Sequence, residues 1–143
     1  MNQITRFDRT SSFSIEDYEL LRLLLSRFQR LLVTAHILTE VSNLMGQLRD
    51  PLRTQYFERL QAEICVLQEE PIESSTAAGG QAFVRFGLTD AGIHTLAEDG
   101  RLVITGDFPL YMFLSSQNIA VINFNQLRPF GWELLRRGHF REG

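Results

Sequence analysis

Three acidic residues stand where carboxylates can gather around a metal ion. We expect Glu40 just inside a helix that follows an apolar strand. Asp90 is expected to open a second helix, and Asp107 to end a second strand. Carboxylate oxygens at strand ends and helix starts suit hard cations such as Mg²⁺ or Mn²⁺.

Each of these acids also has a purely structural interpretation. Asp107 could cap the helix that begins at Phe108, and Asp90 could favour a helix N-terminus through the helix dipole. Glu40 could be an ordinary exposed helix residue. The sequence leaves these alternatives open.

The apolar pattern predicts the elements that position these acids. Short apolar runs predict buried strands at 31–34, 102–105 and 120–124. A capping-box pattern at Ser14 to Asp17 predicts the start of a first helix. Further helices are expected over residues 36–48, 52–68, 90–98, 108–117 and 133–137, and residues 73–81 are expected to form a weak edge strand or a loop. Alternating helices and strands predict an α/β fold with a parallel sheet.

Composition predicts one domain over residues 1–143, because the chain is 44% hydrophobic and 22% charged. The net charge of −3 argues against strong non-specific nucleic-acid binding. All basic residues are arginines, which bind phosphate in a bidentate way. Two groups of arginines could therefore bind a nucleic-acid backbone, or they could simply be solvated surface charge. The groups are Arg22, Arg27 and Arg30, and Arg136, Arg137 and Arg141.

The lone cysteine, Cys65, cannot form an intramolecular disulfide, and its apolar neighbours predict a buried thiol. This favours a reducing, cytoplasmic setting. We expect no membrane partner, because no apolar run is long enough to cross a bilayer. The histidines lack metal-ligand spacing: His36 is expected at a strand–helix corner and His94 in solvent. Trp132 is a candidate partner contact.

Three segments resemble the PIN-domain family of metal-dependent ribonucleases. They are Thr-Ala-His-Ile-Leu-Thr-Glu-Val-Ser-Asn-Leu (34–44), Phe-Gly-Leu-Thr-Asp-Ala-Gly-Ile (86–93) and Ile-Thr-Gly-Asp-Phe-Pro-Leu-Tyr (104–111). The resemblance runs from about Phe7 to Phe130. It implies a three-layer α/β/α fold with a small parallel sheet.

The resemblance also implies a site of four acids, of which the second, third and fourth fall on Glu40, Asp90 and Asp107. The first would be an Asp at the end of an opening central strand. Asp8 is the only acid before the first helix, and its polar neighbours do not predict a buried strand. Three explanations stay open: a longer native N-terminus, a truncated remnant, or a partner chain that fills the gap.

The activity implied is hydrolysis of phosphodiester bonds in single-stranded RNA with Mg²⁺ or Mn²⁺, with Glu40, Asp90 and Asp107 as catalytic metal ligands. The implied partners are RNA, a second copy in a homodimer and an inhibitory antitoxin-like protein. The alternative is a catalytically incomplete module that binds protein or RNA. A dinucleotide-binding enzyme is disfavoured, because Gly79-Gly80 does not lie between a strand and a helix.

Overall fold

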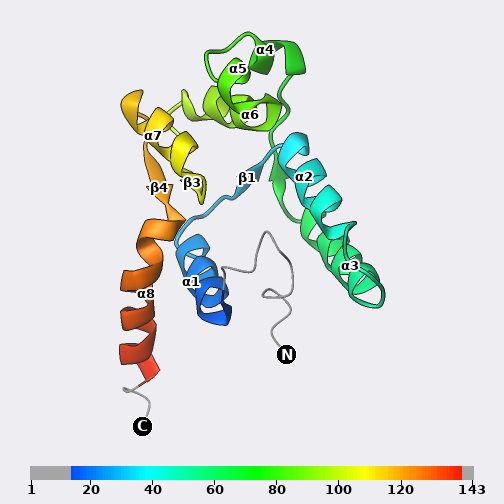
Figure 1. Cartoon of the computed structure of the whole chain (residues 1–143), viewed down its shortest axis with the longest axis vertical. Helices are drawn as coiled ribbons and strands as arrows, with labels where there is room; N and C mark the ends of the chain where they lie inside the picture. Colours follow the sequence, from blue (N-terminus) through cyan, green and yellow to red (C-terminus); the bar gives the residue numbers. More distant parts are fainter. Residues whose placement is uncertain (1–13, 140–143) are drawn as a thin grey trace.

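The protein is described by a computed structural model that covers residues 14–139, without the side chains of Ile15, Trp132 and residues 134–139. Its helices and strands alternate along the chain (Figure 1). The elements are α1 (Ile15–Leu25), β1 (Leu32–Val33), α2 (Ala35–Met45), α3 (Leu52–Ile64), β2 (Gln68–Glu69), α4 (Ser74–Ala78), α5 (Phe83–Phe86), α6 (Leu88–Ala97), β3 (Val103–Thr105), α7 (Phe108–Ser116), β4 (Val121–Asn123) and α8 (Phe124–His139). The expected mixed α/β class is confirmed.

The strands form two separate sheets of two strands each within this part of the chain. β1 pairs with β2 in parallel, with Leu32 opposite Gln68. β3 pairs with β4 in parallel, with Ile104 opposite Ile122. The strand pairing is therefore parallel, as expected, but it is divided between two sheets where one was predicted.

The helices surround these strands in three groups. In Figure 1, β1 crosses the middle of the molecule between α1 and α2. α2 packs on α3, and α4 and α5 pack on α6. α8 extends away from β4 and packs along α1. The single predicted domain thus consists of helical groups linked through short strands.

Small residues form the core beneath α6. Ala77, Ala82 and Ala91 are almost fully buried, and partly buried side chains including Phe86 and Phe113 pack around them. The rings of Phe86 and Phe113 have centroids 5.2 Å apart in a tilted arrangement. Alanine at these positions lets α4, α5 and α6 approach closely, which fixes the helix that carries Asp90.

The capping box at the start of α1 is confirmed, and its acid has a second role. The Ser14 N–H donates to the Asp17 carboxylate (2.8 Å), and the Asp17 N–H donates to the Ser14 hydroxyl (3.2 Å). Asp17 is only 1% exposed and also pairs with Arg128 of α8, with Nη2 and Oδ2 2.8 Å apart. Burying a carboxylate is costly unless it is paired, so this contact fixes where α8 lies against α1.

Several predicted boundaries are wrong. The helix expected over 52–68 ends at Ile64, and Gln68–Glu69 form strand β2 beside β1. Residues Ser74–Ala78 are helical, where a strand or loop was expected. The final helix begins at Phe124 rather than at residue 133 and runs through Pro129. Tertiary contacts with α1 outweigh the poor helix propensity of the Pro and Gly residues in α8.

The expected burial of Cys65 is also wrong, because this residue lies exposed after the end of α3. The apolar run around it continues beyond the helix, and Val66 is 79% exposed. A search of the described residues found no helix of the length and apolarity needed to span a bilayer.

The α1–α8 contact gives a test of this packing. A Cβ on Gly131 would lie 2.9 Å from Leu20 Cγ and closer still to its methyl carbons. Gly131→Ala should lower the free energy of unfolding by about 1–2 kcal/mol, because overpacking of about 1–3 kcal/mol exceeds the gain in helix propensity. Chemical denaturation measures this value.

A double-mutant cycle provides the control. In the Leu20→Ala background the obstructing side chain is gone, so Gly131→Ala should be neutral or stabilising there. An equal loss in both backgrounds would contradict the proposed contact.

Candidate functional site

The first candidate acid, Glu40, lies on α2 as expected. Thr34 follows β1 and caps this helix, since its hydroxyl accepts from the Ile37 N–H (3.2 Å). Thr34 is only 1% exposed, so the start of α2 is firmly placed. Glu40 lies one turn further along on the exposed surface, where its Oε1 accepts from the Thr89 hydroxyl (2.7 Å).

That hydrogen bond joins Glu40 to the helix that carries the second acid. Asp90 is the third residue of α6, which begins after Gly87. Gly87 has φ of 87°, a conformation that favours glycine, and it lets α5 turn directly into α6. Thr89, the second residue of α6, makes no capping hydrogen bond, and its hydroxyl instead donates to Glu40 of α2.

The third acid, Asp107, is the N-cap of α7. Its Oδ1 accepts from the Leu110 N–H (2.9 Å), and its own N–H donates to the Thr105 hydroxyl (3.1 Å). The structural interpretation left open by the sequence is therefore confirmed for this residue. Capping uses one carboxylate oxygen, so it does not prevent the other from binding a ligand.

Two asparagines support Asp107, and the sequence analysis missed both. Asn125 Nδ2 donates to the Gly106 carbonyl (2.8 Å), and the Asn123 side chain accepts from the Asn125 N–H (3.0 Å). They fix the turn between β3 and α7 from the end of the neighbouring strand β4. The signal in the sequence was a pair of asparagines directly after an apolar strand.

The structure brings the three acids into one electrostatic environment. Burial, the negative charge of Asp107 and that of Glu40 together raise the pKa of Asp90 from its usual 3.8 to about 6. The dipole of α6 favours a charged Asp90 by about 0.3–1 kcal/mol. The raised pKa shows that burial and the two neighbouring carboxylates outweigh it.

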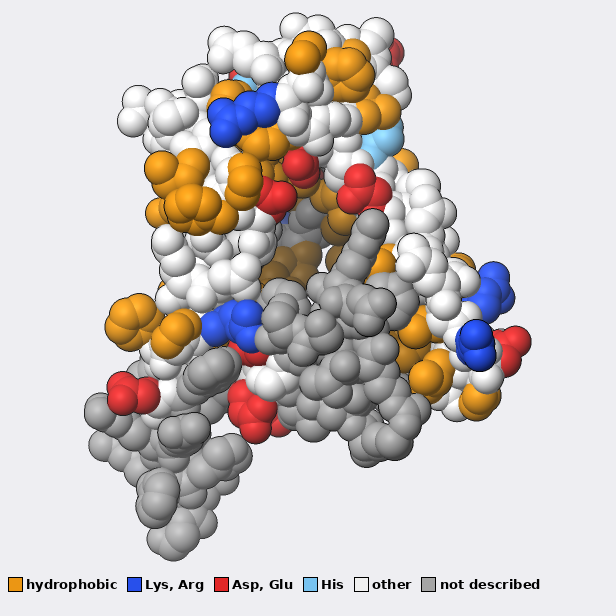
Figure 2. Space-filling view, in the orientation of Figure 1, with side chains coloured by type: hydrophobic (Ala, Val, Ile, Leu, Met, Phe, Trp, Pro, Cys, Tyr) orange, Lys and Arg blue, Asp and Glu red, His pale blue; other side chains and the backbone are white. Residues whose placement is uncertain are grey.

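On the surface, acidic side chains gather around a hollow in the centre of one face (Figure 2). The acids are not a closed coordination shell: within residues 14–139, no three His, Cys, Asp or Glu side chains form one group able to hold a metal ion. The donor chemistry fits Mg²⁺ or Mn²⁺, and Mg²⁺ commonly uses one or two carboxylates and retains several waters. An ion held by these acids would therefore keep part of its hydration shell.

The remaining predicted residues divide between the site, the core and undescribed regions. His36 lies at the start of α2 as expected, with a buried Nδ1 that has no hydrogen-bond partner in the described structure. The expectation for His94 is wrong, since it is 3% exposed and packs against the Phe113 ring (5.1 Å between centroids). Asp8 and the Trp132 side chain lie outside the described residues.

Of the two arginine groups, only the first has side chains that the structure describes. Arg22, Arg27 and Arg30 are all exposed, which agrees with solvated charge for the first two. Arg30 instead lines a cleft between the two sheets. The side chains of Arg136, Arg137 and Arg141 fall outside the described structure.

Comparisons with protein-family models, curated proteins and solved structures found no significant match for this chain. The resemblance described above therefore depends on the three sequence segments alone.

The raised pKa of Asp90 predicts a pH-dependent stability. Asp90 binds a proton more tightly in the folded than in the unfolded chain, so its contribution to stability is full below pH 3.8 and is lost as pH rises through about 6. Asp90→Asn should therefore raise the free energy of unfolding at pH 7.5 by about 1 kcal/mol, because solvent screens part of the unfavourable interaction of the charged carboxylate. The same substitution should change the free energy of unfolding little at pH 4.

Thermal or chemical unfolding at both pH values measures this difference. Glu58→Gln, which removes an exposed carboxylate on α3, is the matched control and should show no such pH dependence. Equal effects of Asp90→Asn at both pH values would show that the three acids do not interact as described.

Proposed function

We propose that this protein is a PIN-like, metal-dependent ribonuclease that hydrolyses phosphodiester bonds in single-stranded RNA. The observation that carries the proposal is the raised pKa of Asp90 beside two further carboxylates. Three acids in electrostatic contact are unfavourable unless a cation or protons offset their charge. A divalent cation would relieve this repulsion.

Each acid has a distinct role in the proposed site. Asp90, half-buried and under the influence of both other charges, would be the central ligand of the ion. Asp107 would bind through the oxygen that does not cap α7. Glu40 would act from the opposite wall, with its carboxylate oriented by Thr89.

Bound Mg²⁺ or Mn²⁺ would supply activation of a water for in-line attack and stabilisation of negative charge on the phosphate and the leaving oxygen. The chain supplies the positions of the carboxylates, which come from three different helices. Because Glu40 and Asp107 lie on the exposed surface, an RNA phosphate could reach the ion from solvent.

The wider proposal follows the family resemblance. It places the protein in the cytoplasm, with RNA as substrate, a second copy as a dimer partner and an antitoxin-like protein as inhibitor. The short parallel strands that precede Glu40 and Asp107 support a three-layer PIN-like architecture as part of this proposal.

A second candidate function is a catalytically incomplete PIN-like module that acts by binding. Two observations favour it. The three acids do not form a closed metal-binding group within the described residues. The two sheets are also separated by an open apolar cleft where a single sheet was expected.

Substitutions that preserve hydrogen bonding separate the two functions. Glu40→Gln retains an acceptor for Thr89, and Asp107→Asn retains a good helix cap. With Mn²⁺ and single-stranded RNA, each should lower the cleavage rate at least about 100-fold, because several kcal/mol of electrostatic stabilisation is lost. Glu58→Gln should cleave at the wild-type rate.

Cleavage at the wild-type rate by both Glu40→Gln and Asp107→Asn would contradict the nuclease proposal. No cleavage by the wild-type protein, with RNA binding or partner binding intact, would favour the incomplete module.

Metal binding can be tested independently of cleavage. Mn²⁺ should raise the thermal stability of the wild-type protein at pH 7.5 and much less at pH 5, where Asp90 is largely protonated. The Mn²⁺ effect should be smaller in Asp90→Asn at both pH values. A stabilisation that is unchanged in this variant would place the ion elsewhere.

A further inference from the structure

One face of α7 exposes large apolar side chains, two of which are aromatic. Phe108 is 55% exposed and Met112 is 50% exposed, whereas Leu110 and Leu114 on the other side of the helix are buried. Residues three and four positions apart share a helix face, so Phe108 lies beside Tyr111 and Met112. Together Phe108, Tyr111 and Met112 form the Phe108 face.

The two rings of the Phe108 face lie against each other. Their centroids are 6.3 Å apart, and the ring planes are inclined by 33°. Tyr111 is half-buried, whereas Phe108 is exposed. More than half of Phe108 therefore remains accessible, and another flat ring can stack on it.

The Phe108 face begins directly beside one of the three acids. Asp107 caps α7 through Oδ1, which accepts from the Leu110 N–H (2.9 Å), and Phe108 is the next residue. Consecutive Cα atoms are only about 3.8 Å apart. Figure 2 shows hydrophobic side chains over α7 beside the acidic side chains that surround the central hollow. The acids and the exposed ring thus adjoin on the same side of the molecule.

This combination matches the two ends of a nucleotide. A phosphate held through a cation at the acids would keep its attached base within reach of the neighbouring surface. Aromatic side chains bind nucleobases by stacking, and they tolerate any sequence because every base has a π-face.

We propose that Phe108 is a base-stacking residue, and that the Phe108 face binds one nucleobase of a single strand whose adjacent phosphate lies at the three acids. The proposal rests on the proposed function for the position of that phosphate. Tyr111 would support the Phe108 ring, and Met112 would border the base. Bases in a duplex are already paired and stacked, so this contact would favour single-stranded RNA over a duplex.

A protein partner fits the Phe108 face less well than a base does. Stable protein interfaces commonly involve about 20–30 residues on each side. The Phe108 face has three side chains, and the exposed residues that follow it are polar, namely Ser115, Ser116 and Gln117. An area of this size is matched to a single base.

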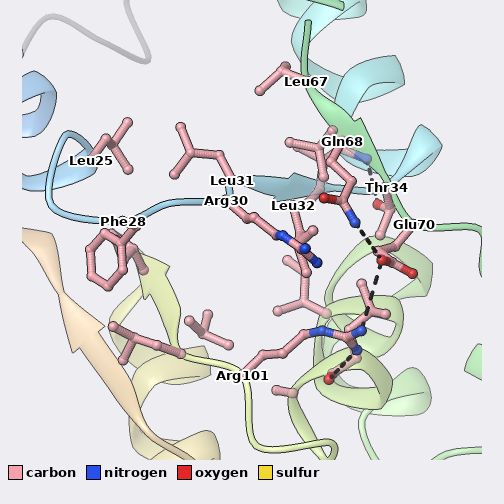
Figure 3. A pocket seen from close by; sticks show the side chains of 18 residues that line it. Leu25, Phe28, Arg30, Leu31, Leu32, Thr34, Leu67, Gln68, Glu70 and Arg101 are labelled. Atoms are coloured by element: carbon pink, nitrogen blue, oxygen red, sulfur yellow. Dashed lines mark hydrogen bonds and ion pairs between the residues drawn. The ribbon is translucent and has the colours of Figure 1, made fainter.

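The apolar cleft between the two sheets is also less suited to a nucleotide. Its volume is about 600 Å³, and its lining includes aliphatic side chains such as Leu32 and Ile104. Figure 3 shows Arg101 and Gln68 in this cleft, and both contact Glu70. Because these polar groups are already engaged, the exposed ring beside the acids is the better site for a base.

RNA binding by variants of Phe108 tests the proposal. The probe is a short fluorescein-labelled single-stranded RNA of mixed sequence, and the readout is fluorescence anisotropy in the presence of Mn²⁺. All proteins in this assay carry Glu40→Gln, which is expected to slow cleavage during the measurement. Phe108→Ala should raise the Kd about tenfold, because the stacking of one base is lost.

Two further substitutions distinguish stacking from a general apolar contact. Phe108→Trp keeps an aromatic face, so its Kd should stay within about threefold of the parent value. Phe108→Leu keeps an apolar side chain without a ring, so it should bind RNA nearly as weakly as Phe108→Ala. Val84→Ala removes an exposed apolar side chain from α5 and is the matched control, which should bind like the parent.

The same RNA annealed to its complement shows whether the base is the group that Phe108 contacts. The Kd for the duplex should be equal in Phe108→Ala and its parent, because paired bases cannot stack on the ring. An equal loss of affinity for single strand and duplex would contradict the stacking role.

Cleavage kinetics separate this proposal from the proposed nuclease activity. With Glu40 intact, Phe108→Ala should raise KM and change kcat much less, because stacking stabilises the bound substrate and the transition state alike. Cleavage by Phe108→Ala with unchanged KM and Kd would overturn the stacking role and leave the nuclease proposal standing. RNA binding that depends on Phe108, without cleavage by the wild-type protein, would support the stacking role and contradict the nuclease proposal.

Two further results would overturn the stacking role. One is the absence of RNA binding by the folded parent protein. The other is a wild-type dimer that Phe108→Ala converts into monomers while RNA binding stays unchanged, which would assign the Phe108 face to a second copy of the chain.

Discussion

Parallel pairing of short strands is the constraint on which the rest of this structure depends. Two parallel strands can pair only if the chain returns to the starting end between them, and here helices make that return. β1 and β2 are joined through α2 and α3, and β3 and β4 through α7. α2 follows β1, and α7 follows β3. Glu40 on α2 and Asp107 at the start of α7 both act electrostatically on Asp90 of α6.

The same constraint leaves the centre of the molecule open. Each strand pair has a backbone edge, at Leu32 or at Ile104, that no described strand satisfies. The apolar side chains around these edges line a cleft instead of a core. Leu32 and Ile104 both line this cleft.

The acid cluster illustrates how structural and chemical roles can coexist. Asp107 caps α7 with one oxygen, and Thr89 donates to Glu40 from the first turn of α6. These contacts hold the carboxylates of Asp107 and Glu40 where their negative charges repel that of Asp90. Burial is the main cause of the raised pKa of Asp90, and repulsion from Asp107 and Glu40 adds to it. The supporting hydrogen bonds are of two kinds: the Asp107 cap is local to α7, whereas the Thr89–Glu40 contact joins α6 to α2.

The sequence by itself determined where α1, α2, α3 and α7 begin and three of the four described strands, because capping residues and apolar runs act over a few residues. The caps at Ser14, Thr34 and Asp107 are of this local kind. Only the tertiary structure decided the burial of His94 and the length of α8, since packing against Phe113 and the Asp17–Arg128 ion pair join distant segments. It also decided that four strands form two sheets, because pairing depends on how the helices fold back.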